Sequence, residues 1–255
     1  MTAALSHSLD RTVVIRATRE TVFRYFTDSA RWAAWWGAGS SIDARPGGAL
    51  RIRYPDGTEA VGEVLEVIAP ERIVFTYGYA TGTPIPPGGS RVTIRVEHHE
   101  AGAQVRLVHD FADAATRDQH VQGWRYQLSL FANVVANDAY AGASDLVDGW
   151  FAAWAIADEA ERERALAAIA LPDVQFGDRY SIIDGRSELV QHIGGAMRFM
   201  PGLHLRRKGS VRHCLGTVLA EWTAVRADQE VASGTNVFEL DATGRIASVT
   251  GFWNA

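Results

Sequence analysis

The sequence contains a single cysteine, Cys214, so no disulfide can form within the chain. It has no run approaching the ~20 consecutive apolar residues that a membrane-spanning helix needs. The first residues, MTAALSHSLDRTVV, also lack an apolar stretch of signal-peptide length. We therefore expect a soluble cytoplasmic protein with no membrane partner.

Concentrated positive charge and metal-ligand motifs are also lacking. The formal net charge is −5, and the basic stretch Arg206-Arg207-Lys208 would alternate between the two faces of a strand. This argues against a nucleic-acid partner, which needs a basic face toward the phosphates. His98-His99-Glu100 falls at an expected hairpin turn, and the chain has neither zinc-ligand spacing nor a phosphate-binding glycine loop. We expect no metal and no cofactor.

Apolar residues, in contrast, are abundant enough for two cores. The 255 residues are 47% hydrophobic and 10% aromatic, and this length exceeds the usual size of one domain. The stretch from Asn137 to Ser144, NDAYAGAS, loses the apolar periodicity of its neighbours and is rich in small residues. We predict domains at residues 1–140 and 141–255.

The stretch from Thr116 to Asn137 predicts a long helix at the end of the first domain. Its apolar residues recur at spacings of three and four, which places them on one stripe of a helix roughly 30 Å long. This stripe consists of Val121, Trp124, Leu128, Phe131 and Val135. Thr116 followed by Gln119 fits a capping box at the start. The apolar face of this helix needs a sheet to cover it.

The residues before this helix predict that sheet. Leu9 to Ala17 indicates a strand, Thr18 caps a short helix, and Ala30 to Trp36 indicates a second helix that stops at Gly37. Between residues 40 and 111, four segments alternate apolar and polar residues, with turn signals between them. Their apolar members begin at Leu50, Ile73, Val92 and Val105. Such alternation is typical of antiparallel strands with one buried face.

Four phrases in the first half resemble the START-like, helix-grip superfamily, in the branch similar to the activator of the heat-shock chaperone ATPase. They are VVIRATRETVFRYFTDSARWAAWWG, ARPGGALRI, GEVLEVIAPERIVFTY and HVQGWRYQLSLF, within residues 7–138. The resemblance implies a curved antiparallel sheet that grips a long C-terminal helix, often with an apolar ligand cavity between them. Folds of this kind host many functions.

We expect aromatic and apolar side chains on the inner face of this sheet and helix to bind a ligand. The candidates are Trp35, Tyr77, Tyr79, His109, Phe111, Trp124 and Leu128. Two interpretations of His109 stay open. It is either a buried histidine bonded to a neighbouring hydroxyl or carbonyl, or a polar anchor for a ligand in an apolar pocket.

The second half predicts three helices, a short strand among them, and then four long strands. Ser144 and Asp158 fit N-caps of the first two helices, and the third runs from Arg186 to Phe199. The strands are expected at residues 173–176, 203–213, 217–226, 230–240 and 245–253. This order indicates a cone formed by a strongly bent sheet covered by helices.

Five phrases between Ser144 and Trp253 resemble the SnoaL-like group of the nuclear-transport-factor-like superfamily. They are LVDGWFAAW, LPDVQFGD, IDGRSELVQHI, MPGLHL and GTNVFELDATGRIASVTGFW. The fold class is therefore α+β, with a helix-grip domain followed by a SnoaL-like cone. Relatives include ketosteroid isomerase and polyketide cyclases, which use a carboxylate inside an apolar cone, and many non-catalytic modules.

By this resemblance, the isomerase's general base corresponds to Asp178, its oxyanion-stabilising acid to Asn236 and its helix tyrosine to Trp150. Asn and Trp offer N–H donors to an enolate oxygen but not the hydroxyl donors of the isomerase, whose own activity is therefore not expected. Alternatively, Asp178 is a turn residue bonded to backbone or to Arg179, Asn236 is a satisfied strand amide, and Trp150 belongs to the core. Further ligand-binding candidates are Trp154, Tyr180, Met197, Trp222 and Phe238.

Three classes of function remain. We rank first the binding of a small hydrophobic ligand, such as a polyketide or steroid-like metabolite, in one or both pockets. An isomerase- or cyclase-type proton transfer without metal would use Asp178 as base, within reach of Asn236 or Trp150. A chaperone-cofactor role would instead use an exposed docking face of the first domain. We also expect a homodimer formed through the second domain.

Overall fold

The computed structural model describes residues 4–254. Its backbone divides into two compact units, Met1–Ala136 and Asn137–Ala255. The domain boundary expected between residues 140 and 141 lies just beyond this division and stays a prediction. Among the described residues, no helix is both long enough and apolar enough to cross a membrane.

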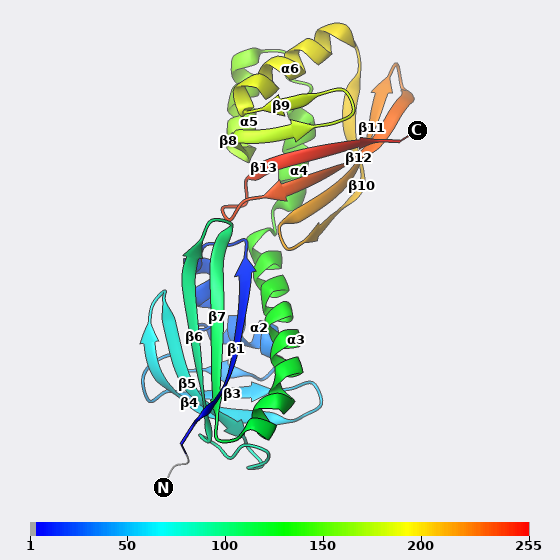
Figure 1. Cartoon of the computed structure of the whole chain (residues 1–255). Helices are drawn as coiled ribbons and strands as arrows, with labels where there is room; N and C mark the ends of the chain where they lie inside the picture. The colour runs from blue at the N-terminus through cyan, green and yellow to red at the C-terminus, as the bar shows by residue number, and fades with distance from the viewer. Residues whose placement is uncertain (1–3, 255) are drawn as a thin grey trace. The chain divides into compact units, whose positions relative to one another are not determined.

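The first unit is built on a seven-stranded antiparallel sheet (Figure 1). Its spatial order is β1-β7-β6-β5-β4-β3-β2. The strands are β1 (His7–Ile15), β2 (Ser41–Ile42), β3 (Ala49–Arg53), β4 (Glu59–Ile68), β5 (Arg72–Tyr79), β6 (Ser90–His99) and β7 (Gly102–Phe111). The sequence did not predict β4 from alternation, because the register shifts between Val64 and Glu66 and interrupts its period of two.

Helix α3 (Ala114–Ala139) packs its apolar stripe against this sheet (Figure 1). Trp124, Leu128, Phe131 and Val135 are buried, as the spacing predicts. The predicted cap at Thr116 is wrong. Asp113 caps the helix instead, because its carboxylate accepts from the Thr116 backbone N–H at 2.8 Å and from the Thr116 hydroxyl at 2.9 Å. The cap of the helix therefore lies three residues earlier than the sequence suggests.

Two short helices complete the core of the first unit. Helix α1 (Arg19–Arg24) begins after Thr18, whose hydroxyl accepts from the Thr21 N–H, so that predicted cap is confirmed. Helix α2 (Ser29–Trp36) ends at Gly37 and buries its three tryptophans. Trp35 packs 4.9 Å from the Phe131 ring of α3, which joins α2 and α3 in one aromatic core.

The second unit is a six-stranded mixed sheet of spatial order β10-β11-β12-β13-β8-β9 (Figure 1). Only β13 and β8 pair in parallel. The strands are β8 (Ala170–Gly177), β9 (Ile182–Asp184), β10 (His204–Cys214), β11 (Thr217–Arg226), β12 (Gln229–Leu240) and β13 (Ile246–Trp253). The helices are α4 (Ala143–Ala153), α5 (Glu159–Ile169) and α6 (Arg186–Phe199). The chain is thus α+β, with an antiparallel sheet and its helices in the first unit and a mixed sheet with three helices in the second.

Two local features of the second unit differ from expectation. Helix α4 has Gly142 at its N-cap without a side-chain hydrogen bond, so the predicted cap at Ser144 is wrong. The cap of α5 is confirmed, since Asp158 accepts from the Glu161 N–H at 2.8 Å. Strand β9 was not predicted because it has three residues, too few for a period to show. Its pairing with β8 makes residues 178–181 a hairpin loop.

A buried arginine fixes α6 relative to α5. Arg162 of α5 is 3% exposed, and its guanidinium donates to the Val190 carbonyl at 3.0 Å and to the Ile156 carbonyl at 2.6 Å. Backbone carbonyls therefore satisfy this buried charge. The orientation of α6 matters because this helix carries one wall of the site described next.

Candidate functional site

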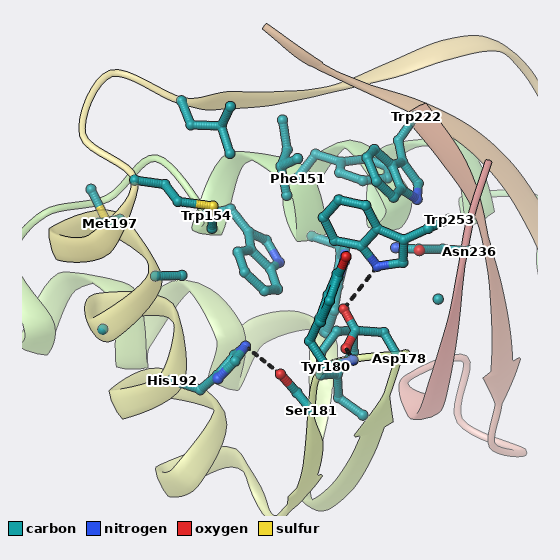
Figure 2. Close-up of a pocket in the computed structure, with 18 of the residues that line it drawn as sticks. Phe151, Trp154, Asp178, Tyr180, Ser181, His192, Met197, Trp222, Asn236 and Trp253 are labelled. Atoms are coloured by element: carbon teal, nitrogen blue, oxygen red, sulfur yellow. Dashed lines mark hydrogen bonds between the residues drawn. The ribbon is translucent and has the colours of Figure 1, made fainter. Parts of the chain in front are cut away.

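An aromatic cavity of about 710 Å³ opens inside the second unit (Figure 2). Four tryptophans border it, Trp150, Trp154, Trp222 and Trp253. They come from α4 and its C-terminal end, from β11 and from β13, while α6 and the β8–β9 loop complete the wall. This volume and this largely apolar lining are typical of small-molecule sites.

Three of these indoles carry an unused hydrogen-bond donor. The Nε1 atoms of Trp150, Trp154 and Trp222 are buried and have no hydrogen-bond partner within the described part of the chain. A buried donor without a partner costs roughly 1–3 kcal/mol. In Figure 2, Trp154 projects into the cavity opposite Tyr180. The largely apolar wall therefore contains three buried N–H donors without a partner.

Asp178 lies in the β8–β9 loop with both carboxylate oxygens engaged (Figure 2). Oδ1 accepts from the Tyr180 backbone N–H at 2.8 Å, and Oδ2 accepts from the Trp253 indole N–H at 3.1 Å. The first bond shapes the turn and the second holds the indole of β13. Asp178 is thus bonded to nearby backbone, one of the two alternatives expected for a turn residue, while Arg179 lies over the Tyr180 ring, 5.1 Å from its centre.

The predicted catalytic residues share this one cavity. Asn236 of β12 is 6% exposed and pairs across the sheet with Gly251 of β13. A Cβ placed on Gly251 would lie 3.2 Å from Asp178 Cβ and 3.3 Å from Asn236 Oδ1. The two side chains therefore meet at one point of the wall, and Trp150 borders the same cavity. Their catalytic roles stay predictions.

A row of aromatic rings leads from the rim into the cavity. Tyr180 is 69% exposed, and its ring stands edge-on to Trp253 at 5.2 Å. Trp253 in turn stands edge-on to Trp222 at 5.0 Å. Because Asp178 bonds to Tyr180 and to Trp253, its carboxylate holds two of these three residues in place.

His192 and Ser181 also line the cavity, and sequence reasoning missed both (Figure 2). His192 of α6 stands edge-on to Trp154, with ring centres 5.8 Å apart, and its Nε2 lies 3.5 Å from the Ser181 hydroxyl. A signal was present in the sequence. His192 follows the buried Leu189 by three residues, which places it on the inward stripe of the helix.

The remaining candidates of the second unit divide between the cavity and its surroundings. Trp154, Tyr180, Met197 and Trp222 border the cavity. Phe238 is fully buried beneath the wall, 5.8 Å from the Trp150 ring, and does not border it. Its contribution is to support Trp150.

A smaller cavity of about 380 Å³ lies in the first unit between the sheet and α3. Of the residues predicted there, Trp35, Tyr77, Tyr79 and Trp124 line it. His109, Phe111 and Leu128 are buried but do not border it. Trp36, Tyr54 and His120 line it as well and were not predicted as site residues.

His109 belongs to a closed hydrogen-bond network rather than to the open surface of that cavity. Its Nδ1 accepts from the Trp124 indole N–H at 2.9 Å, so Nε2 carries the proton and donates to the Ser90 hydroxyl at 2.8 Å. Ser90 then donates to the Tyr77 carbonyl. Burial holds the pKa of His109 well below its ordinary value. Of the two interpretations of His109, the structure therefore agrees with the buried histidine bonded to a neighbouring hydroxyl.

Two further polar pairs line the cavity of the first unit. The hydroxyls of Tyr54 and Tyr77 lie 2.9 Å apart, and burial raises the pKa of Tyr54 to about 12. His120 donates from Nδ1 to the Thr116 carbonyl, so its Nε2 accepts from the Tyr79 hydroxyl at 3.2 Å. Burial lowers the pKa of His120, which favours this neutral form.

Residues 16–136, within the first unit, match the family model described as activator of Hsp90 ATPase homolog 1-like protein. The second unit lies outside that match. No curated protein matches the chain. The described residues contain no group of three or more His, Cys, Asp or Glu side chains placed to hold a metal ion.

Among solved structures, the chain is similar to a proposed isomerase of the SnoaL-like family from Agrobacterium tumefaciens. The two are 23% identical with a TM-score of 0.42, and the match covers 44% of this chain and 96% of that one. It is also similar to protein MLL2253 from Mesorhizobium loti, with 17% identity and a TM-score of 0.45 over 51% and 96%. A third is the Aha1 dimer from Colwellia psychrerythraea, with 17% identity and a TM-score of 0.42 over 48% and 90%. Such low values carry no conclusion about function.

Proposed function

We propose that the second unit binds a small, flat, largely apolar molecule that carries at least one acceptor oxygen. A polyketide-like or steroid-like ketone has this chemistry. The observation that supports the proposal is the set of three buried indole N–H groups, on Trp150, Trp154 and Trp222, without a partner in the described structure. They border a cavity of about 710 Å³ whose lining is largely aromatic and aliphatic.

The physical argument rests on what such a wall selects. Aromatic side chains give affinity to a flat apolar molecule without selecting among such molecules. An N–H donor that is already desolvated gains a hydrogen bond to the ligand without first losing one to water. The cavity therefore favours a ketone over a hydrocarbon of the same shape.

A matched pair of ligands tests this directly. We expect 2-tetralone to bind more tightly than tetralin, which has the same bicyclic skeleton but no oxygen. One additional hydrogen bond of about 1 kcal/mol corresponds to roughly a fivefold difference in Kd. Titration followed by tryptophan fluorescence or calorimetry gives both constants.

A matched pair of variants locates the site. Trp154→Phe removes one indole N–H and leaves most of the ring, so it should weaken 2-tetralone binding and leave tetralin binding nearly unchanged. Trp124→Phe is the control, because that residue lines the cavity of the first unit and its N–H already bonds to His109. Equal affinity for both ligands, or an effect of Trp124→Phe alone, would contradict the proposal.

A second candidate function is an isomerase- or cyclase-type proton transfer on such a ketone. Its support is that the cavity brings proton acceptors and N–H donors to one wall, with Asp178 and Asn236 meeting at Gly251. Proton removal beside a carbonyl needs a base and donors directed at the developing enolate oxygen.

The chaperone-cofactor role is supported only by the family match of the first unit. A homodimer through the second domain stays a prediction.

A further inference from the structure

We propose that His192, rather than Asp178, is the group that accepts the proton in this cavity, and that its substrates are ketones with an acidic C–H beside the carbonyl. This inference rests on the proposed ligand site and assigns its chemistry. Among the described residues that line the cavity, Asp178 has the one carboxylate and His192 the one imidazole, so these two side chains are the candidate bases.

The hydrogen bonds of Asp178 give it a different role. One oxygen is held by the Tyr180 backbone and the other by the Trp253 indole. A substrate proton would have to compete with these donors, and its transfer would loosen the turn and the rim indole. Asp178 is therefore a positioning residue, which fixes Tyr180 and Trp253 in the aromatic row.

His192 is comparatively free to accept a proton. Its one side-chain hydrogen-bond contact within the described part of the chain is a long one, 3.5 Å from Nε2 to the Ser181 hydroxyl. Figure 2 shows this nitrogen facing the cavity on the side where Ser181 and Tyr180 stand. Imidazole is also the side chain used most often as a general base near neutral pH.

The donor for the ketone oxygen stands beside this base. The His192 and Trp154 rings are nearly perpendicular, with centres 5.8 Å apart, and the Trp154 N–H has no partner among the described residues. A bound ketone would bond its oxygen to the Trp154 N–H and place its adjacent C–H against His192. The helix end that carries Trp154 and helix α6 hold the two rings, so neither lies in the β8–β9 loop.

The step balances without a further reactant. The C–H bond beside the carbonyl breaks, its proton passes to His192 Nε2, and the electron pair forms an enolate whose oxygen accepts from the Trp154 N–H. The imidazolium then returns a proton to the same carbon or to a conjugated one. In D₂O the imidazolium exchanges its proton with solvent, so the ketone gains deuterium.

Deuterium exchange at C1 of 2-tetralone, followed by NMR in D₂O, tests the proposal on the full chain. We expect the wild type to accelerate this exchange above the buffer rate and His192→Gln to lose most of the acceleration, by about 100-fold or more. Asp178→Asn should retain as much as Trp253→Phe, because both remove the hydrogen bond between the Asp178 carboxylate and the Trp253 indole.

Each outcome decides between the two assignments. Acceleration that survives in His192→Gln overturns the proposal. Loss in Asp178→Asn with retention in Trp253→Phe would make the carboxylate itself the base and equally overturns it. If 2-tetralone binds but does not exchange, the chemistry fails and the proposed binding function stands. If 2-tetralone does not bind, the binding function fails first.

Discussion

The Trp124 indole of α3 donates to Nδ1 of His109 on β7, at 2.9 Å. This bond crosses the space between the helix and the sheet, and it fixes which nitrogen of His109 carries a proton. Because Nε2 is satisfied by Ser90, the imidazole has no free nitrogen for a ligand. The helix and the sheet of the first unit are thus joined by a specific polar contact within an aromatic core.

Truncation of Trp124 should be strongly destabilising. Trp124 is 4% exposed and packs against His109 and Trp36, so Trp124→Ala should lower the free energy of unfolding by about 3–5 kcal/mol. Trp124→Phe keeps most of the ring and leaves His109 Nδ1 without its donor, which should cost about 1–3 kcal/mol. Urea denaturation measures both. A loss below 1 kcal/mol for the alanine variant would show that Trp124 lines a void instead of filling the core.

The first unit should lose stability on mild acidification. The pKa of His109 is held well below its ordinary value of about 6.5, so below that pH the unfolded chain takes up a proton that the folded state does not. The contribution of His109 to the free energy of unfolding is therefore fully present above this pH. It declines as the pH falls toward the pKa that His109 has in the folded state. One such group contributes up to about 1.4 kcal/mol per pH unit. The lowered pKa of His120 acts in the same direction.

Urea midpoints between pH 7.5 and pH 5 would measure this effect. Carboxylates with lowered pKa values, such as Asp10 and Asp113, act at lower pH, below about 4. His109→Gln should show a shallower dependence than the wild type, with His120 left to titrate. A variant slope as steep as that of the wild type would assign the effect to other groups.

The start of α3 should depend on Asp113. Asp113→Ala removes both cap bonds and should cost about 1 kcal/mol, while Thr116→Val retains the bond from the backbone N–H and should cost less. Thermal unfolding of the two variants ranks them. The reverse ranking would restore the capping box that the sequence suggests at Thr116.

The second unit should need Tyr140 to fold well. Tyr140 is 4% exposed, donates to the Asp241 carbonyl at 2.9 Å and packs 5.1 Å from His213. We propose that the two units fold separately, and a fragment of residues 137–255 should then unfold cooperatively at higher urea than one of residues 143–255. Tyr140→Phe in the longer fragment is the control for the hydroxyl bond. Equal midpoints for the two fragments would contradict a role for this residue.

Local rules predicted much of the fold because they depend on neighbours in sequence. Helix α6 and strand β11 have the bounds that periodicity suggests, and Thr18 and Asp158 cap as expected. The same rules suggested Thr116, whereas Asp113 forms the cap, because both residue types fit a cap and only the backbone decides between them. Strand β4 was missed because a bulge interrupts its alternation.

The candidate site depends on relationships that a sequence does not contain. The meeting of Asp178 and Asn236 at Gly251 requires the register of β12 with β13 and the hairpin of β8 with the unpredicted β9. The unpaired state of the Trp154 donor is a property of everything around it, so no spacing of residues reveals it. The helical spacing after Leu189 does indicate that His192 lies on the inward face of α6, but the sequence analysis did not name it as a candidate.

The indole N–H signals of the protein test the central claim most directly. The chain has eight tryptophans, four before residue 137 and four after it, and each gives one signal in a ¹H–¹⁵N spectrum. Addition of 2-tetralone should shift the Trp154 signal downfield, as a new hydrogen bond to oxygen requires, while tetralin should not. Assignment by Trp154→Phe identifies the peak. Shifts confined to the tryptophans of the first unit, or equal shifts with both ligands, would contradict a ketone-binding site in the second unit.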